Sequence, residues 1–418
     1  MMISKPYSEA YVWLWLPSAT EPIVAGKLEA HGKKLRFNYG KRYLQRADAI
    51  SIYHEELPLQ PGYIDPIKNL ELANCIRDAS PDAWGRRVMM NKKFGRKSNS
   101  LDSLQLDELT YLLESGSDRI GALDFQRSPT IYEPRCSVNV SLDELLESAE
   151  RVEKGIPLTD ELDQALHHGS SIGGARPKAL IESDDKKYVA KFPSSSDIYS
   201  VVKAEFIAMR LAQLAGLNVA PVMLTQSSHK DVLLIERFDR NRTTDGLWQR
   251  KMMVSALTIL EVHEHEARYA SYEELAHLIR QQFADAKATL KELFSRIVFN
   301  IFVGNTDDHA RNHAAFWDGN QLHLTPAYDI CPQSRSGGIA SQAMLIDGDH
   351  RESQLALCVK AAATFHLSKD DALAMIQYQK EIIEHNWDTV CDEAHTTTVE
   401  KNIFWGRQFL NPYIFEGL

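Results

Sequence analysis

The stretch from Gly304 to Asn312 holds the densest group of side chains that could carry out chemistry. It contains two acids, one histidine and two carboxamides. The spacing of Asp307 and Asn312 is Asp-x-x-x-x-Asn, with which protein kinases place a proton-accepting Asp and a magnesium-binding Asn. The alternative is a polar loop whose Asp and Asn side chains only cap turns. The spacing alone leaves both interpretations open.

A second magnesium-binding acid would have to follow on the far side of a hairpin. Residues 315–317 and 322–324 have the character of two short strands, and Asp318-Gly319-Asn320 between them is a good hairpin turn. The chain then reaches Tyr328 and Asp329. We therefore expect Asp329 to return beside Asn312.

A buried helix must deliver this loop to a fixed place. Apolar residues recur at steps of three and four before it, as one stripe of a helix requires: Leu290, Leu293, Phe294, Ile297, Val298, Ile301 and Phe302. Gly304 follows where a helix C-terminus favours a residue that tolerates positive φ.

A glycine-rich stretch earlier in the chain, residues 169–178, could bind an anion. Its backbone N–H groups could cradle phosphate oxygens, with Ser170 and Ser171 as further donors. It is not a Walker A sequence, because no Gly-Lys-Ser/Thr closes it. A glycine-rich turn between strands is the alternative. The residues in question are Gly173, Gly174, Ala175, Arg176, Pro177 and Lys178.

Two strands are predicted after this stretch, at 179–181 and 187–192, and the second carries Lys191. The N-lobe of a kinase has this order: a glycine-rich turn, a strand, and then a strand whose lysine binds the α- and β-phosphates. A helix is predicted over 203–217, with Glu205 in its first turn. Glu205 could pair with Lys191 as the kinase αC glutamate does, or could be a favourable charge at a helix N-terminus.

A further buried strand is predicted at 232–235 and leads into Glu236, Arg237 and Phe238. In a two-lobed kinase this would be the hinge whose backbone meets the adenine. From about residue 248 onward the pattern is mostly helical, and Ser368 is placed to begin one helix. Ser141 and Glu144 fit a capping box for another.

Composition excludes several classes of protein. The 418 residues are 44% hydrophobic, enough for two packed lobes, and the net charge of −10 disfavours a bare nucleic-acid-binding surface. Five cysteines without a C-x-x-C pair favour a reducing cytoplasm, with thiols in or near the core. The N-terminus lacks a signal pattern, and no apolar run is long enough to span a bilayer.

Two conspicuous groups have ordinary explanations. Trp84 is most simply a core aromatic, and nothing in the first 130 residues looks catalytic. His263-Glu264-His265-Glu266 resembles a metal cluster by composition. However, histidines two apart point to different sides of a helix, and the spacing is not His-Glu-x-x-His. A solvated charged face is expected.

Several motifs, in one order along the chain, together resemble the HipA family of toxin kinases. They are Ser171-Ile172-Gly173-Gly174-Ala175-Arg176-Pro177-Lys178, Glu236-Arg237-Phe238-Asp239-Arg240, Asn305–Asn312 and Tyr328-Asp329. Pro81–Arg86 and Arg119–Leu123 are similar to the N-terminal region of that family. The resemblance therefore spans nearly the whole chain.

The resemblance implies an α+β, two-lobed protein-kinase-like (HipA-like) fold, with a β-rich N-terminal lobe and a mostly helical C-terminal lobe. We expect an N-terminal subdomain over 1–130, the rest of the N-lobe over 131–240, and the helical C-lobe over 241–418. The implied activity is serine/threonine protein kinase activity in the cytoplasm. The implied target is an aminoacyl-tRNA synthetase, and the implied partner is a small HipB-like helix-turn-helix antitoxin, through which alone DNA would be contacted.

The resemblance also assigns roles. Asp307 would be the proton acceptor, Asn312 and Asp329 the Mg²⁺ ligands, and Lys191 the phosphate-gripping lysine. The remaining ATP-binding positions would be Gly173 to Lys178, Glu236 to Phe238, His309, Arg311 and Tyr328. Ser171, or its neighbour Ser170, matches a serine that some members autophosphorylate, where added negative charge would oppose nucleotide binding.

Three other functions stay open. One is a small-molecule phosphotransferase, which would share the Asp-x-x-x-x-Asn logic. The second is an ATP-binding protein without activity. The third is a corepressor acting mainly through its antitoxin. We expect Lys191, Asp307 and Asp329 to line a single cleft that faces a triphosphate.

Overall fold

The alternating strands near the N-terminus form an antiparallel sheet of five strands, in the order β4-β3-β2-β1-β5. The computed structural model describes residues 7–94, 106–136, 140–159, 170–171, 173–183, 185–335 and 337–418. The hydroxyl of the buried Tyr39 in this sheet donates to the backbone carbonyl of Leu57 at 2.7 Å, so the loop after the strand supplies its hydrogen-bond partner. The strands are β1 (Glu9–Leu14), β2 (Ile23–His31), β3 (Lys34–Tyr39), β4 (Tyr63–Ile64) and β5 (Leu123–Gln126).

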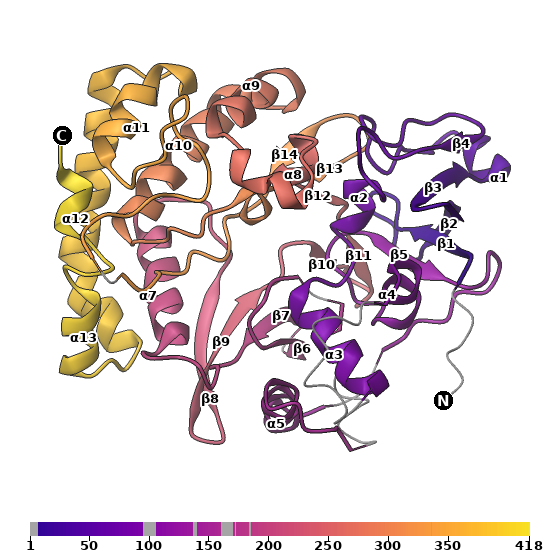
Figure 1. Cartoon of the computed structure of the whole chain (residues 1–418), viewed down its shortest axis with the longest axis horizontal. Helices are drawn as coiled ribbons and strands as arrows, with labels where there is room; N and C mark the ends of the chain where they lie inside the picture. Colours follow the sequence, from indigo (N-terminus) through magenta and orange to yellow (C-terminus); the bar gives the residue numbers. More distant parts are fainter. Residues whose placement is uncertain are drawn as a thin grey trace. The chain divides into compact units, whose positions relative to one another are not determined.

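The chain divides into two compact units. Unit 1 comprises Met1–Ser196, Gln226–Val254 and Trp317–Asn320; unit 2 comprises Asp197–Thr225, Ser255–Phe316 and Gln321–Leu418. Figure 1 follows the chain through both units.

A second antiparallel sheet, of order β6-β7-β9-β8, carries the predicted lysine strand. Its strands are β6 (Lys178–Ser183), β7 (Lys186–Lys191), β8 (Val222–Ser227) and β9 (Lys230–Glu236). In unit 1, helices α3 (Ala83–Phe94) and α5 (Leu142–Glu153) pack on β6, β7 and β9 through a buried cluster that includes Trp84, Leu146 and Phe192. The predicted capping box of Ser141 and Glu144 begins α5.

Short elements complete the strand-rich part of the chain. They are α1 (Lys41–Leu44), α2 (Asn74–Arg77), α4 (Glu108–Glu114), β10 (Arg240–Arg242), β11 (Trp248–Arg250), β12 (Met253–Ser255), β13 (Ala314–Trp317) and β14 (Leu322–Leu324). β10 pairs with β11, and the last three strands form a sheet of order β12-β13-β14. β13 and β14 form the predicted hairpin, and Gly319 between them has φ +99°.

Unit 2 is mostly helical, as predicted. In Figure 1, α7 and α12 lie side by side. The seven apolar residues of the predicted stripe are all buried in α10, and each such side chain stabilises the fold by roughly 1.5–3 kcal/mol. The helices are α7 (Val201–Leu214), α8 (Ala256–Ile259), α9 (Tyr272–Gln282), α10 (Ala286–Phe302), α11 (Leu355–Ala361), α12 (Lys369–Glu393) and α13 (Thr398–Phe404). The described residues of unit 2 also form the 3₁₀ turns η4 (Glu264–Tyr269), η5 (Ala310–Asn312), η6 (Ala362–Phe365) and η7 (Pro412–Phe415).

Three local expectations were wrong. Glu205 is not in the first turn of its helix, because α7 begins at Val201. His263 and His265 do not point to different sides: His263 caps the 3₁₀ turn η4, so the two ring centroids lie 4.8 Å apart. Cys136 is exposed, whereas the other four cysteines are buried as expected.

Among the described residues, no helix is long and apolar enough to cross a membrane.

Candidate functional site

The end of α10 fixes where the polar loop begins. The N–H of Gly304 donates to the carbonyl of Ile301 at 3.2 Å, and the N–H of Asn305 donates to the carbonyl of Asn300 at 2.9 Å. This pair of bonds is a Schellman motif with Gly304 in the left-handed region at φ +67°. A Cβ on Gly304 would lie 2.5 Å from the carbonyl oxygen of Gln408, so a larger residue does not fit.

A buried polar network supports the loop from below, and Asp308 is its centre. The Oδ2 atom of Asp308 accepts from Asn300 Nδ2 at 2.8 Å and from the hydroxyl of Tyr272, and lies 3.0 Å from His313 Nε2. Burial alone would raise the pKa of Asp308, but the charge of His313 and these hydrogen bonds hold that pKa below its usual range. Asp308 is therefore a structural residue, whereas the adjacent Asp307 is exposed.

Asp307, Asn312 and Asp329 come together in unit 2. Asn312 donates its side-chain N–H to the backbone carbonyl of Asp307 at 3.2 Å. Asn305, itself held by Asn300 at 2.9 Å, places its Nδ2 atom 3.5 Å from the carbonyl of Asp329. Asp329 adopts φ +59°, an uncommon conformation for a non-glycine residue and one found at functional sites.

Electrostatics distinguish Asp307 from an ordinary surface acid. Partial desolvation of its carboxyl group has the largest effect and raises its pKa; the charge of His309 lowers that pKa, and the negative charges of Asp329 and Asp308 each raise it by less. A neighbour with like charge disfavours the ionised form, and a cation between the two acids would relieve this. The site is thus suited to a proton acceptor next to a metal.

The oxygen donors present fit magnesium. The side-chain nitrogen of Asn312 is engaged by Asp307, which leaves its carboxamide oxygen as the donor, and Asp329 supplies a carboxylate. Mg²⁺ is usually bound by one or two carboxylates plus phosphates and water, not by a protein cage. Accordingly, no group of three or more His, Cys, Asp or Glu residues within the described ranges could hold a metal ion.

Arg311 and Tyr328, two predicted ATP-binding residues of unit 2, have structural partners, whereas His309 differs from them. Arg311 pairs with Glu264 at 2.8 Å, and the hydroxyl of Tyr328 donates to the carbonyl of Arg311 at 2.6 Å. The buried Nδ1 atom of His309 has no hydrogen-bond partner among the described residues. The first two side chains therefore hold the loop around Asn312 in shape.

In unit 1, the segment that opens α3 holds the glycine-rich stretch. The N–H of Gly174 donates to Asp82 Oδ2 at 3.1 Å, and the carbonyl of Gly174 accepts from the N–H of Trp84 at 2.9 Å. The indole N–H of Trp84 donates to the carbonyl of Lys178 at 2.9 Å. A Cβ on Gly85 would lie 2.6 Å from the carbonyl oxygen of Ser170.

These contacts are what the sequence did not reveal. Trp84 is a core aromatic, as predicted, and is fully buried, but it also fixes both ends of Gly174–Lys178. A Pro-Asp before a helix start signals a capping acid. Nothing in the sequence indicates that the acid also binds a loop some 90 residues later. Of the glycine-rich stretch, Gly169 and Ile172 lie outside the described residues.

Two buried lysines face each other across β6 and β7. Lys178 pairs in register with Lys191, so both side chains lie on the same face of the sheet. Lys178 Nζ donates to the carbonyl of Gly173 at 2.8 Å. Two cations on one face, next to a glycine-rich turn, form a surface suited to an anion.

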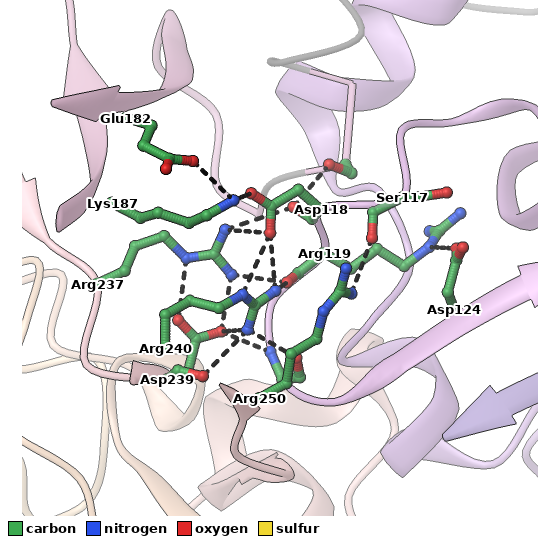
Figure 2. Close-up of polar contacts among 12 residues, drawn as sticks. Ser117, Asp118, Arg119, Asp124, Glu182, Lys187, Arg237, Asp239, Arg240 and Arg250 are labelled. Atoms are coloured by element: carbon green, nitrogen blue, oxygen red, sulfur yellow. Dashed lines mark hydrogen bonds and ion pairs between the residues drawn. The ribbon is translucent and has the colours of Figure 1, made fainter. Parts of the chain in front are cut away.

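The predicted hinge ends β9, where Glu236 is opposite Tyr188 on β7. The side chain of Arg237 is buried in unit 1, where it pairs with Asp118 at 2.9 Å and with Asp239 at 2.8 Å (Figure 2). Glu236 pairs with Lys186 at 2.6 Å. Any contact of this segment with adenine would therefore use its backbone or Phe238. The proposed pairing of Glu205 with Lys191 stays a prediction.

Comparisons with known proteins show which family this chain resembles in sequence and fold. Residues 170–395, more than half of the chain, match the HipA-like C-terminal domain, and residues 19–126 match the HipA N-terminal domain. The structure of HipA from the HipA–HipB–operator DNA complex of Shewanella oneidensis aligns over 97% of this chain and 99% of that one, with a TM-score of 0.61 and 18% identity. That likeness confirms the predicted α+β fold.

Individual relatives match over shorter ranges. A protein of Sinorhizobium fredii designated a putative kinase, Y4mE, is 31% identical over 150 residues, which are 35% of this chain and 34% of that protein. The serine/threonine-protein kinase toxin HipA of Shewanella oneidensis is 25% identical over 204 residues, 43% of this chain and 47% of the relative. The chain thus spans between a third and a half of the length of these relatives.

The fold and the two matched domains define a protein of the HipA-like, kinase-related class. The chain belongs to the HipA family, as its motifs predicted.

Proposed function

We propose that this protein is a serine/threonine protein kinase of the HipA toxin type, which transfers the γ-phosphate of ATP to a protein hydroxyl. The observation that carries the proposal is the convergence of Asp307, Asn312 and Asp329 in unit 2. The loop before β13 supplies the first two residues and the segment after β14 supplies the third. This is the order in which a kinase catalytic loop and its metal-binding Asp occur.

In this proposal Asp307 orients the acceptor hydroxyl and takes its proton, and its exposed position leaves it accessible to a protein substrate. Asn312 and Asp329 would hold Mg²⁺ through one carboxamide oxygen and one carboxylate. When bound, Mg²⁺ neutralises charge that develops on the transferred phosphoryl group. The Schellman turn at Gly304 and the buried carboxylate of Asp308 keep Asp307 and Asn312 at a fixed separation.

The residues of unit 1 would bind the nucleotide. Lys191 and Lys178 supply positive charge for the phosphates, and the backbone of Gly173–Lys178 supplies N–H donors. The N–H of Gly174 is already used by Asp82, so phosphate binding at that N–H would require the carboxylate to withdraw. The backbone of Glu236, Arg237 and Phe238 would meet the adenine. His309, Arg311 and Tyr328 would border the phosphates.

Ser171, or Ser170, is the proposed autophosphorylation site. Both hydroxyls are buried: Ser170 Oγ accepts from the N–H of Gly116 at 3.0 Å, and Ser171 Oγ donates to the carbonyl of Asp118 at 3.2 Å. Either serine would therefore have to leave this position before it could react.

The proposed protein substrate is an aminoacyl-tRNA synthetase, whose modification would inhibit translation and growth. The proposed partner is a small HipB-like antitoxin that itself binds DNA. The Shewanella oneidensis relative, seen in complex with HipB and operator DNA, supports the partner. The acidic net charge of −10 fits a protein that contacts DNA only through such a partner.

The test is to incubate the protein with γ-labelled ATP, Mg²⁺ and a bacterial lysate, and to identify labelled proteins by mass spectrometry. The proposal predicts label on serine or threonine of a small set of proteins, a tRNA synthetase among them. Label confined to small molecules would instead indicate a small-molecule phosphotransferase. No transfer at all would contradict the kinase proposal.

A further inference from the structure

One short segment of unit 1, residues 116–121, contacts two other parts of the chain. One is the serine pair, Ser170 and Ser171, and the other is β9 with residues 237–240 that follow it, here called the hinge strand. On one side, Gly116 and Asp118 bind Ser170 and Ser171 through their backbones, at 3.0 Å and 3.2 Å. On the other side, the Asp118 carboxylate faces the residues that follow β9 (Figure 2).

The Asp118 carboxylate is shared among three cations. Its Oδ1 atom lies 2.9 Å from Arg237 and 2.8 Å from Arg240, and its Oδ2 atom lies 2.9 Å from Lys187 on β7. Burial alone would raise the pKa of Asp118, but these three positive charges hold it well below its usual range. The group is therefore ionised at neutral pH.

Hydrogen bonds between side chains and backbone groups also join residues 116–121 to residues 237–240. Arg237 Nη2 donates to the carbonyl of Arg119 at 2.7 Å, and the N–H of Gly121 donates to Asp239 Oδ2 at 2.8 Å. Arg240 also bonds the carbonyl of Gly121, at 2.9 Å. The side chains of Arg237 and Arg240 are only 2% and 1% exposed, so these guanidinium groups cannot turn to water if Asp118 is lost.

We propose that Asp118 is a positioning residue that couples the serine pair of the glycine-rich stretch to the hinge strand, its carbonyl holding Ser171 and its carboxylate holding Arg237 and Arg240. Displacement of the Asp118 carboxylate should then increase the mobility of the serine pair and of the hinge strand together. Where the proposed function holds, the two segments coupled in this way are the ones that would bind the phosphates and the adenine. Asp118 thus acts on ATP affinity without touching the nucleotide.

The chain offers a matched control in Asp124. This acid is also in unit 1 and is also shared by arginines, at 3.0 Å from Arg119 and 2.9 Å from Arg135. It is more buried than Asp118, with 0% of its side chain exposed against 21%, so its loss should destabilise unit 1 at least as much. No described contact joins its side chain to Ser171 or to Arg237.

The experiment measures hydrogen–deuterium exchange by mass spectrometry on the full chain, in Asp118→Asn and in Asp124→Asn. The proposal predicts that Asp118→Asn speeds amide exchange in peptides covering 170–178 and 236–240 together, and that Asp124→Asn does not. Asp118→Glu keeps the charge, and with it the fold, but moves the carboxylate by one methylene. It should give smaller increases in the same two peptides.

Equal exchange in the Asp118 and Asp124 variants, or a change in only one of the two peptides, would overturn the coupling. If wild-type protein transfers phosphate, KM for ATP should rise by about tenfold in Asp118→Asn, within the range of a coupling between two sites, with kcat nearly unchanged. An unchanged KM would overturn the effect on ATP affinity. If wild-type protein transfers none, the proposed function fails, whereas the exchange result still decides the coupling.

Discussion

At the scale of single residues, Asp307 and Asp308 show how adjacent identical side chains take different roles. Asp308 is 2% exposed and accepts hydrogen bonds in a closed network, whereas Asp307 is exposed and has the raised pKa. The Asp-x-x-x-x-Asn spacing selected Asp307 from the sequence. The sequence could not indicate that Asp308 is the structural centre, because Tyr272 and Asn300, which bind it, come from α9 and α10.

The two acids should respond differently to loss of charge. Asp308→Asn leaves His313 and Tyr272 without their anionic partner, and should lower the free energy of unfolding by about 3 kcal/mol, measured by urea denaturation. Asp307→Asn, at an exposed position, should stay within about 0.5 kcal/mol of wild type. Equal destabilisation by both would contradict the division of roles.

The raised pKa of Asp307 predicts a particular pH dependence. A proton acceptor must be ionised, so kcat should fall as the pH decreases through the pKa of Asp307, above the 3.8 of an ordinary Asp. Asp329→Asn removes one of the charges that raise this pKa, so the pKa of the Asp307 carboxyl, followed by NMR in the metal-free protein, should be lower in the variant than in wild type. A pKa that is unchanged or higher in the variant would show that Asp329 does not act on Asp307.

At the scale of elements, periodicity predicted much of what positions the site. α10 with its buried stripe, the β6–β7 pair, the β13–β14 hairpin, the capping box of α5 and the start of α12 after Ser368 are all present. What could not be predicted are contacts between distant elements, such as Trp84 of α3 on Lys178 of β6. Local patterns record which face of an element is buried but not which partner covers it.

Gly304 is the element-scale position whose replacement should matter most. Gly304→Ala combines strain at φ +67° with a contact of 2.5 Å to the carbonyl of Gln408. Gly348→Ala is the control, because Gly348 has φ +53° with no atom within 4 Å of the added Cβ. The control should lose about 1–2 kcal/mol of unfolding free energy. Gly304→Ala should lose at least about 1 kcal/mol more, as judged by urea denaturation; equal losses would show that the contact with Gln408 is not important.

At the scale of the whole molecule, the proposal assigns Mg·ATP to side chains that lie far apart in the sequence, among them Lys191 and Asp329. A ligand that binds only the folded protein raises its stability by about 2.7 kcal/mol at a hundredfold excess over Kd. Family motifs spread along the chain allowed this assignment. Neither composition nor periodicity could have supplied it, because neither identifies side chains that share a ligand.

Mg·ATP should therefore raise the Tm of wild-type protein by about 2 °C or more. Lys191→Met and Asp329→Asn should each abolish the rise, whereas Asp349→Asn, a change of the same charge in an exposed loop of unit 2, should retain it. Differential scanning calorimetry provides the measurement. Full retention of the rise in either of the first two variants would remove that residue from the nucleotide site.

The most direct test of the central claim is the rate of phosphoryl transfer from γ-labelled ATP to protein by wild type, Asp307→Asn and Asp349→Asn, at saturating Mg·ATP. If Asp307 is the proton acceptor, Asp307→Asn should be slower by about 10²- to 10⁴-fold while still binding nucleotide, and Asp349→Asn should match wild type. Transfer by Asp307→Asn at the wild-type rate would contradict the claim.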